Sequence, residues 1–133
     1  MLLATAHLDD NEFLAAFYSL RLKSSEFHRA DHLRLAWLEV HGKPIGAALS
    51  SVRIGIQAFA AQHAASGIYH ETITTAWVRL IATHDEKSFD EFLKANEHRL
   101  NLDLLHRFWT PTLLRSDEAR ARWTPPDLRT LPM

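Results

Sequence analysis

The chain has 133 residues, and its 15 lysines and arginines nearly balance its 16 aspartates and glutamates, giving a formal net charge of -1. This length predicts one helical domain spanning residues 1–133, and the charge balance argues against nucleic acid as a partner. The absence of cysteine excludes disulfides, thiolate metal sites and cysteine nucleophiles, whereas nine histidines are unusual in so short a chain. No secretory signal and no apolar run long enough for a membrane span is present, so a cytoplasmic protein without a membrane partner is expected.

The first half of the chain carries three helical patterns. Asp9 and Asp10 are suited to cap a helix that continues to about residue 22. A second helix is expected over 28–41 and a third over 45–66, because apolar residues recur there every three or four positions. The third pattern is the clearest in the sequence.

The second half carries four shorter patterns, over 69–83, from Ser88, over 101–109 and over 116–123. Thr110-Pro111 is expected to end the third of these, because proline disfavours helical backbone at the residue before it. Pro125 and Pro126 favour an extended segment. The sequence therefore predicts an all-α protein, a compact bundle of five to seven helices with an extended Pro-rich C-terminal strap.

One helical face over 28–41 groups two imidazoles with a carboxylate. His28, His32 and Glu39 share this face at helical spacing. Imidazole nitrogens and a carboxylate oxygen are suitable ligands for a divalent metal, so this face is one candidate cofactor site. The alternative is that His28 lies at the fraying helix start and His32 is a hydrogen-bonded core histidine.

The segment Tyr-His-Glu-Thr at 69–72 forms a second candidate site. His70 aligns with Trp77 on the apolar side of the predicted helix, and Glu71 lies about 100° around it. The sequence resembles the start of the zincin motif, but Thr74 occupies the second histidine position, so that assignment fails. A helix N-terminus favours neutral imidazole, which suits His70 as a base or a metal ligand. The alternative role for His70 is to cap the helix.

Three further residues are candidates for substrate binding. His63 ends the long apolar stripe of the third helix, where it would reach a shared pocket or interact with the last carbonyls. Tyr69 would donate a hydrogen bond to a bound molecule, and Trp77 would line an aromatic cavity or pack in the core. Arginines at 115, 120, 122 and 129 are suited to clamp an anion, but interleaved acidic residues favour an ion-paired face.

Three blocks of sequence carry a resemblance to a known group. Ala-Asp-His-Leu-Arg-Leu-Ala-Trp at 30–37, Tyr-His-Glu-Thr-Ile-Thr at 69–74 and a C-terminal Ser116, Ala119-Arg120, Pro-Asp-Leu pattern resemble an uncharacterised family of small helical bacterial proteins. The resemblance implies a helical fold and no established reaction. Relatives often have a histidine where this chain has Arg29, which leaves open whether His28 or Arg29 belongs to a site.

Two functions of different kinds follow from these patterns. In the first, His32, His70 and Glu71 meet in a pocket between helices, where they bind or transform a small molecule. In its metal version His28, His32 and His70 supply imidazole ligands and Glu39 or Glu71 an oxygen, and in the slightly favoured metal-free version His70 is the acid/base. In the second, the chain is a non-catalytic helical interaction module whose histidines are structural. Its broad apolar faces also suit a homodimer.

Overall fold

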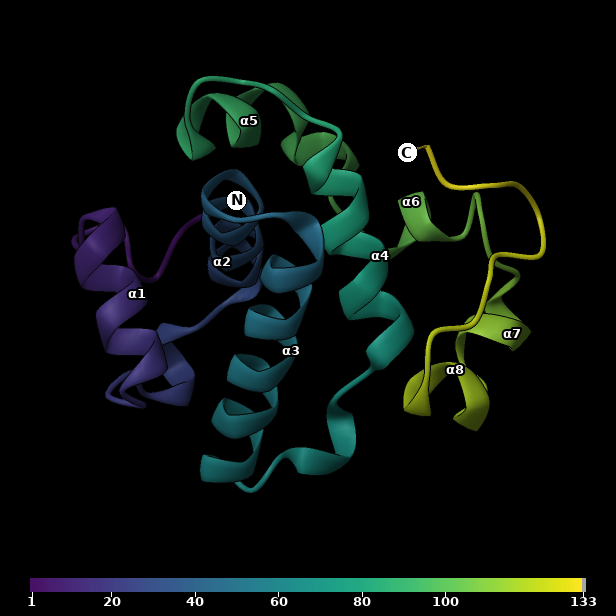
Figure 1. Ribbon diagram of the computed structural model, residues 1–133, viewed down its shortest axis with the longest axis horizontal. Coiled ribbons are helices and arrows are strands. Elements are labelled where there is room, and N and C mark those ends of the chain that lie inside the picture. Colours follow the sequence, from purple (N-terminus) through teal and green to yellow (C-terminus); the bar gives the residue numbers. More distant parts are fainter. Residues whose placement is uncertain (133) are drawn as a thin grey trace. The chain divides into compact units, whose positions relative to one another are not determined.

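The computed structural model describes residues 1–132, and every regular element in that range is a helix (Figure 1). The all-α prediction is confirmed. The eight α-helices exceed the predicted five to seven because the second half of the chain forms several very short ones. They are α1 (Asp10–Tyr18), α2 (Arg29–Gly42), α3 (Ile45–Gln62), α4 (Glu71–Ala82), α5 (Phe89–Asn96), α6 (Leu102–Leu105), α7 (Pro111–Leu114) and α8 (Asp117–Ala121).

The helices divide into two compact units, Met1–Tyr69 and the chain from His70 onward. The sequence predicted one domain over 1–133, because no linker-like composition marks a boundary. The division falls between the 3-10 turn η2 (Ser66–Ile68) and α4. None of the helices in residues 1–132 has the length and apolar character needed to cross a membrane.

In the first unit, α1 begins as the sequence predicts but ends early. Asp9 caps the helix by accepting a hydrogen bond from the Glu12 backbone N–H, and the Glu12 carboxylate accepts one from the Asp9 backbone N–H. Leu20 has a φ of 62°, a left-handed conformation that does not continue an α-helix. The chain therefore turns near residue 20 and continues through the 3-10 turn η1 (Ser24–Glu26).

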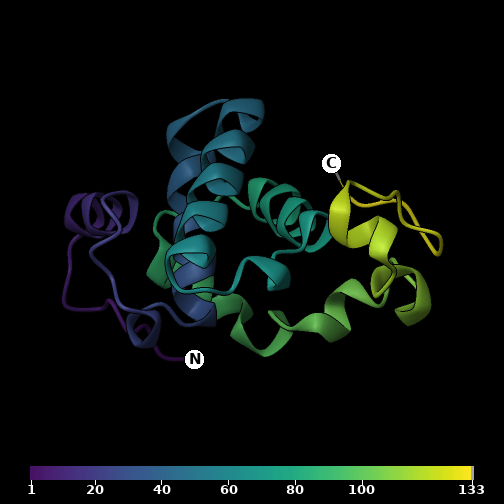
Figure 2. The same cartoon turned by 90° about the horizontal axis from the view of Figure 1, so that it is seen from below.

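Helices α2 and α3 pack side by side and form the main helix pair of the first unit (Figure 2). Four phenylalanine rings, Phe13, Phe17, Phe27 and Phe59, make a continuous aromatic cluster beside them. Gly55 lets α3 approach α1 closely, because a Cβ there would lie 2.6 Å from the Phe17 ring. The cluster provides most of the aromatic core of this unit.

A buried polar network ties the N-terminal segment to α2. Asp31 is fully buried and accepts hydrogen bonds from the backbone N–H groups of Ala4 and Thr5 and from the Thr5 hydroxyl. Arg34 donates to the carbonyls of Thr5 and Leu8 and pairs with Asp10. Because these buried groups are mutually satisfied, the network holds the chain start in place.

The second unit is built around α4 and a core cluster that includes the fully buried Trp109. Trp109 Nε1 donates to the carbonyl of Thr124, and the Leu128 backbone N–H donates to the carbonyl of Phe108. These bonds and the buried Leu131 hold the non-helical C-terminal segment against the same core.

Helix α7 was not predicted from the sequence. Thr110 and Pro111 were expected to end a helix over 101–109, yet α6 stops at Leu105 and the pair starts α7. The Thr110 hydroxyl accepts from the Leu113 backbone N–H, and Pro111 occupies the first turn. A threonine followed by proline suits a helix start as well as a helix end, since proline has no N–H to leave unpaired at that position.

Candidate functional site

The structure separates two of the residues that were grouped as a metal-binding face. His28 is the exposed N-cap residue, and its backbone N–H donates a 2.9 Å hydrogen bond to Asp31. Glu39 is buried, and its carboxylate accepts from the Tyr18 hydroxyl at 2.9 Å and pairs with the Lys43 ammonium at 2.7 Å. Burial and then the charge of Glu39 raise the pKa of Tyr18. Partners within the first unit therefore balance the charge of Glu39.

His32 and His63 lie at opposite ends of an aromatic row in the first unit. The His32 ring lies 4.1 Å from the Phe27 ring, Phe27 contacts Phe59, and Phe59 lies 4.4 Å from His63. His63 Nε2 donates to the carbonyl of Leu22 at 3.3 Å, so it contacts another segment and not only its own last turn. These contacts place two phenylalanine rings between the two histidines.

His32 is an exposed residue, so the alternative interpretation of it as a core histidine is wrong. Desolvation by the surrounding protein lowers the pKa of His32, and the charge of Asp31 opposes this effect.

His70 caps α4, which confirms the alternative role that the sequence analysis left open. Nδ1 accepts a 3.1 Å hydrogen bond from the Ile73 backbone N–H, and Nε2 donates a 2.7 Å hydrogen bond to the carbonyl of Leu114. Burial lowers the pKa of His70, and the charge of Arg120 acts in the same direction. Both ring nitrogens therefore contact backbone groups of the second unit.

The remaining predicted residues divide between the two units. Glu71 is buried in the first turn of α4 and accepts from the Thr75 hydroxyl at 3.2 Å. Tyr69 ends the first unit, where it follows η2. Since His32 belongs to the first unit and His70 and Glu71 to the second, their convergence stays a prediction. Nowhere in residues 1–132 do three or more histidine, aspartate or glutamate side chains gather as a metal site would require.

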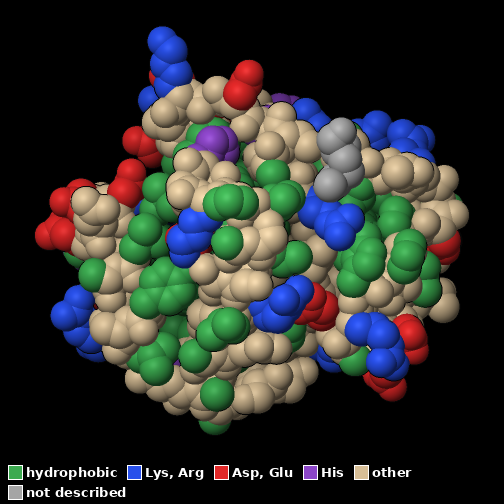
Figure 3. All heavy atoms as spheres, in the orientation of Figure 1, with side chains coloured by type: hydrophobic (Ala, Val, Ile, Leu, Met, Phe, Trp, Pro, Cys, Tyr) green, Lys and Arg blue, Asp and Glu red, His purple; other side chains and the backbone are tan. Residues whose placement is uncertain are grey.

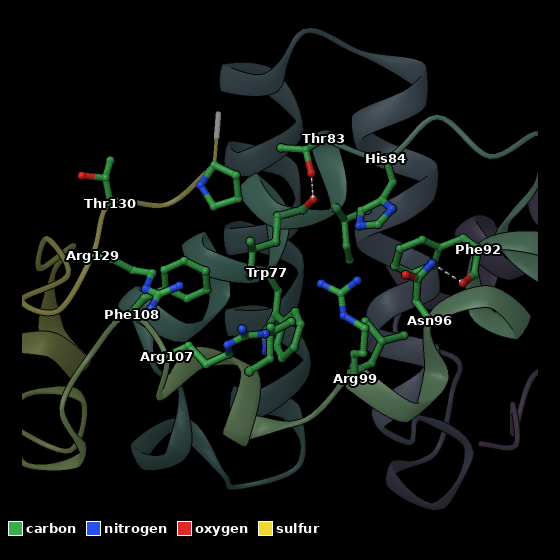
Figure 4. Close-up of a pocket in the computed structure, with 15 residues that line it drawn as sticks. Trp77, Thr83, His84, Phe92, Asn96, Arg99, Arg107, Phe108, Arg129 and Thr130 are labelled. Atoms are coloured by element: carbon green, nitrogen blue, oxygen red, sulfur yellow. Dashed lines mark hydrogen bonds between the residues drawn. The ribbon is translucent and has the colours of Figure 1, made fainter.

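A pocket of about 380 Å³ lies within the second unit (Figure 4). Trp77, a predicted substrate-binding residue, lines it from α4. Its other apolar lining residues come from α4, α5, the segment 100–108 and the C-terminus: Leu80, Ile81, Phe92, Leu100, Leu104, Phe108 and Pro132. The volume falls in the range of small-molecule sites, about 300–1,000 Å³.

The charged lining of this pocket is cationic. Arg99 comes from the 3-10 turn η3 (Glu97–Arg99), Arg107 from the chain after α6, and Arg129 from the C-terminal segment. Figure 4 shows Arg107 near Trp77, with Arg99 and Arg129 on opposite sides of it. No aspartate or glutamate lines the pocket, and within the described chain no carboxylate forms an ion pair with these guanidinium groups.

A histidine with an acidic partner lies at the pocket wall. His84 Nδ1 lies 3.2 Å from a Glu86 oxygen, and the His84 ring packs edge-on against Phe92 at 4.9 Å. Burial raises the pKa of Glu86, but hydrogen bonds from its own backbone, the charge of His84 and the amide of Asn96 together bring it below its usual value. Glu86 is therefore ionised near neutral pH, when it accepts a hydrogen bond from His84 and holds the ring in place.

A second, shallower hollow of about 250 Å³ adjoins the pocket. It shares Arg99, Leu104 and Arg107 with the pocket and adds His98, Asn101 and Asp103. The two guanidinium groups therefore border both spaces.

The arginines of this site were not predicted from the sequence. Arg99 and Arg107 stand in no motif, and Arg129 was grouped with arginines near it in sequence. Of that group, Arg122 pairs with Glu118 at 2.9 Å, as the ion-paired interpretation expects, but Arg129 lines the pocket. Only the fold brings Arg129 close to the segments that carry the other two.

Comparison with protein-family models, with curated proteins and with solved structures finds no match to this chain.

Proposed function

We propose that the second unit binds a small organic anion in the pocket between α4, α5 and the C-terminal segment. One observation carries this proposal: three arginines line the pocket, and none of its lining residues within 1–132 is an aspartate or glutamate. Guanidinium groups are preferred partners of carboxylates, sulfonates and phosphates, because their planar N–H donors match two acceptor oxygens at once. This proposal keeps the small-molecule function predicted from the sequence but moves its centre from His32, His70 and Glu71 to the arginine pocket.

The apolar wall adds a second requirement for the ligand. Trp77 and Leu104 pack against the core cluster of the second unit, so the pocket floor is continuous with that core. A ligand that combines an anionic group with an apolar body suits both the arginines and the apolar floor of the pocket. The apolar body replaces water on the floor, and the anionic group pairs with the guanidinium groups. A simple inorganic anion would leave the apolar floor uncovered.

Exposed apolar residues in the first unit support the interaction-module alternative less strongly. Ile45 and Ile54 on α3 and Ile68 on η2 are exposed, and Figure 3 shows hydrophobic side chains among polar ones over α3. Single exposed apolar side chains are ordinary on protein surfaces. The pocket is the feature that this alternative does not explain.

The test is calorimetric titration of the full chain with four aromatic probes: benzoate, benzenesulfonate, phenyl phosphate and the neutral benzyl alcohol. The proposal expects at least one anion to bind and benzyl alcohol to bind more weakly than that anion. Arg129→Gln should weaken binding of that anion about tenfold, the effect of one lost charge-assisted hydrogen bond. Arg115→Gln is the matched control, because Arg115 is exposed and lies outside the pocket lining.

Two results would overturn the proposal. The first is that none of the three anions binds to a chain whose circular dichroism shows it folded. The second is that Arg115→Gln and Arg129→Gln weaken binding equally, since the effect would then come from net charge and not from the pocket.

A further inference from the structure

We infer that the preferred anionic group of the ligand is a phosphate monoester on an apolar, ring-sized body. This inference rests on the proposed function and specifies its ligand class. It follows from the number of cationic groups at the pocket and from the separate segments that carry them.

The first observation is the positive charge of the pocket lining. Arg99, Arg107 and Arg129 bring three permanent positive charges to a pocket whose described lining residues include no aspartate or glutamate. A carboxylate or sulfonate supplies one negative charge, whereas a phosphate monoester carries about -1.5 to -2 near pH 7. The phosphate therefore balances more of the local charge than the other two anions.

The second step is the number of acceptors. The three guanidinium groups come from η3, from the chain after α6 and from the C-terminal segment, so they approach the pocket from three separate parts of the backbone. A carboxylate has two oxygens, which one arginine can occupy in a bidentate pair, but a phosphate monoester has three terminal oxygens. A phosphate monoester therefore has an oxygen left for a second arginine after one arginine has formed a bidentate pair, whereas a carboxylate has none.

The experiment compares phenyl phosphate, benzoate and inorganic phosphate by calorimetric titration of the full chain at pH 7.5. Phenyl phosphate is expected to bind at least tenfold more tightly than benzoate, because it adds charge and one more acceptor. It should also bind at least tenfold more tightly than inorganic phosphate, which has no ring for the apolar wall. Arg99→Gln, Arg107→Gln and Arg129→Gln should each weaken phenyl phosphate binding, and Arg115→Gln should not.

A pH series gives a second readout that does not depend on a variant. The second ionisation of a phosphate monoester has a pKa of about 6, so the affinity for phenyl phosphate should rise between pH 5.5 and 7.5. Benzoate is already ionised across this range, so it reports any change in the protein alone. The difference between the two slopes measures recognition of the dianion.

The outcomes separate this inference from the proposed function. If benzoate binds as tightly as phenyl phosphate, the phosphate assignment is overturned and the organic-anion pocket stands. If inorganic phosphate binds as tightly as phenyl phosphate, the inference that the ligand has an apolar body is overturned. If no aromatic anion binds to the folded chain, the proposed function itself fails.

Discussion

His70 Nε2 donates a 2.7 Å hydrogen bond to the backbone carbonyl of Leu114, which lies 44 residues further along the chain. On the other side of the ring, Nδ1 accepts from the Ile73 backbone N–H. A carbonyl only accepts and a backbone N–H only donates, so the two bonds together require the neutral imidazole with its proton on Nε2. One side chain thus caps α4 and fastens the end of α7 to it.

Replacing His70 should destabilise the second unit in two separable steps. His70→Ala removes the cap and the tie to Leu114, and it should lower the free energy of unfolding by about 1–2 kcal/mol, a typical effect of losing an N-cap. His70→Asn keeps an oxygen for the cap but is too short to reach Leu114, so its effect should be smaller. Urea unfolding followed by circular dichroism measures both, and an unchanged His70→Ala midpoint would contradict the structural role.

The same geometry predicts a pH dependence with a defined sign. Burial lowers the pKa of His70 below its usual value of 6.5, so the folded protein favours the neutral ring more than the unfolded chain does. The stability contributed by the neutral ring is therefore fully present above about pH 6.5 and is lost as pH falls toward the lowered folded value. In urea unfolding at a series of pH values, His70→Asn should lose less stability than the wild type between pH 7 and pH 5. Parallel curves would show that other groups cause the dependence.

The sequence predicted helix starts well where a single residue caps the helix. Asp9, Ser88 and Ser116 were expected to start helices, and each accepts the capping hydrogen bond in the structure. Thr110-Pro111 was predicted to end a helix but starts α7, because the same pair suits both ends of a helix. The packing of Trp109 and Leu114 in one core favours the helix start. Helix existence was therefore predictable, whereas the short α6 and α7 depended on tertiary contacts.

The candidate site was less predictable than the fold. Trp77 was named from its place on the apolar side of a helix, and it does line the pocket. The periodicity of α2 could not show that Glu39 would meet Tyr18 and Lys43, because Tyr18 comes from another helix. Helical spacing predicts which side chains share a face, but partners from other elements decide whether those side chains remain available to a ligand.

Two glycines in α3 provide a matched test of packing in the first unit. A Cβ on Gly55 would lie 2.6 Å from a Phe17 ring atom and 2.9 Å from a Tyr18 ring atom, so one of the rings must shift. Gly55→Ala should therefore destabilise the fold by about 1–3 kcal/mol, as overpacked cores do. Gly46 has no such neighbour within 4 Å, and Gly46→Ala should be neutral or stabilising by up to about 1 kcal/mol because alanine favours helix.

Thermal and urea unfolding of the two alanine variants distinguish packing from helix propensity. Both variants make the same chemical change in the same helix, so a difference in sign isolates the contact with Phe17 and Tyr18. Equal stabilisation by both changes would show that α1 does not pack closely on α3 in solution.

Thr72 connects α4 to the C-terminal segment that carries Arg129. Its side chain is fully buried, and its hydroxyl donates to the carbonyl of Arg122 at 2.9 Å and accepts from the Thr124 backbone N–H at 3.1 Å. Thr72→Val keeps the shape but leaves both backbone groups without this partner, which should cost about 1–3 kcal/mol of unfolding free energy. Thr72→Ser retains the hydroxyl and loses one methyl group, so it should cost about 1 kcal/mol. Urea unfolding ranks the two variants, and a Thr72→Val protein more stable than Thr72→Ser would show that burial of the methyl group, and not the pair of hydrogen bonds, holds the segment to α4.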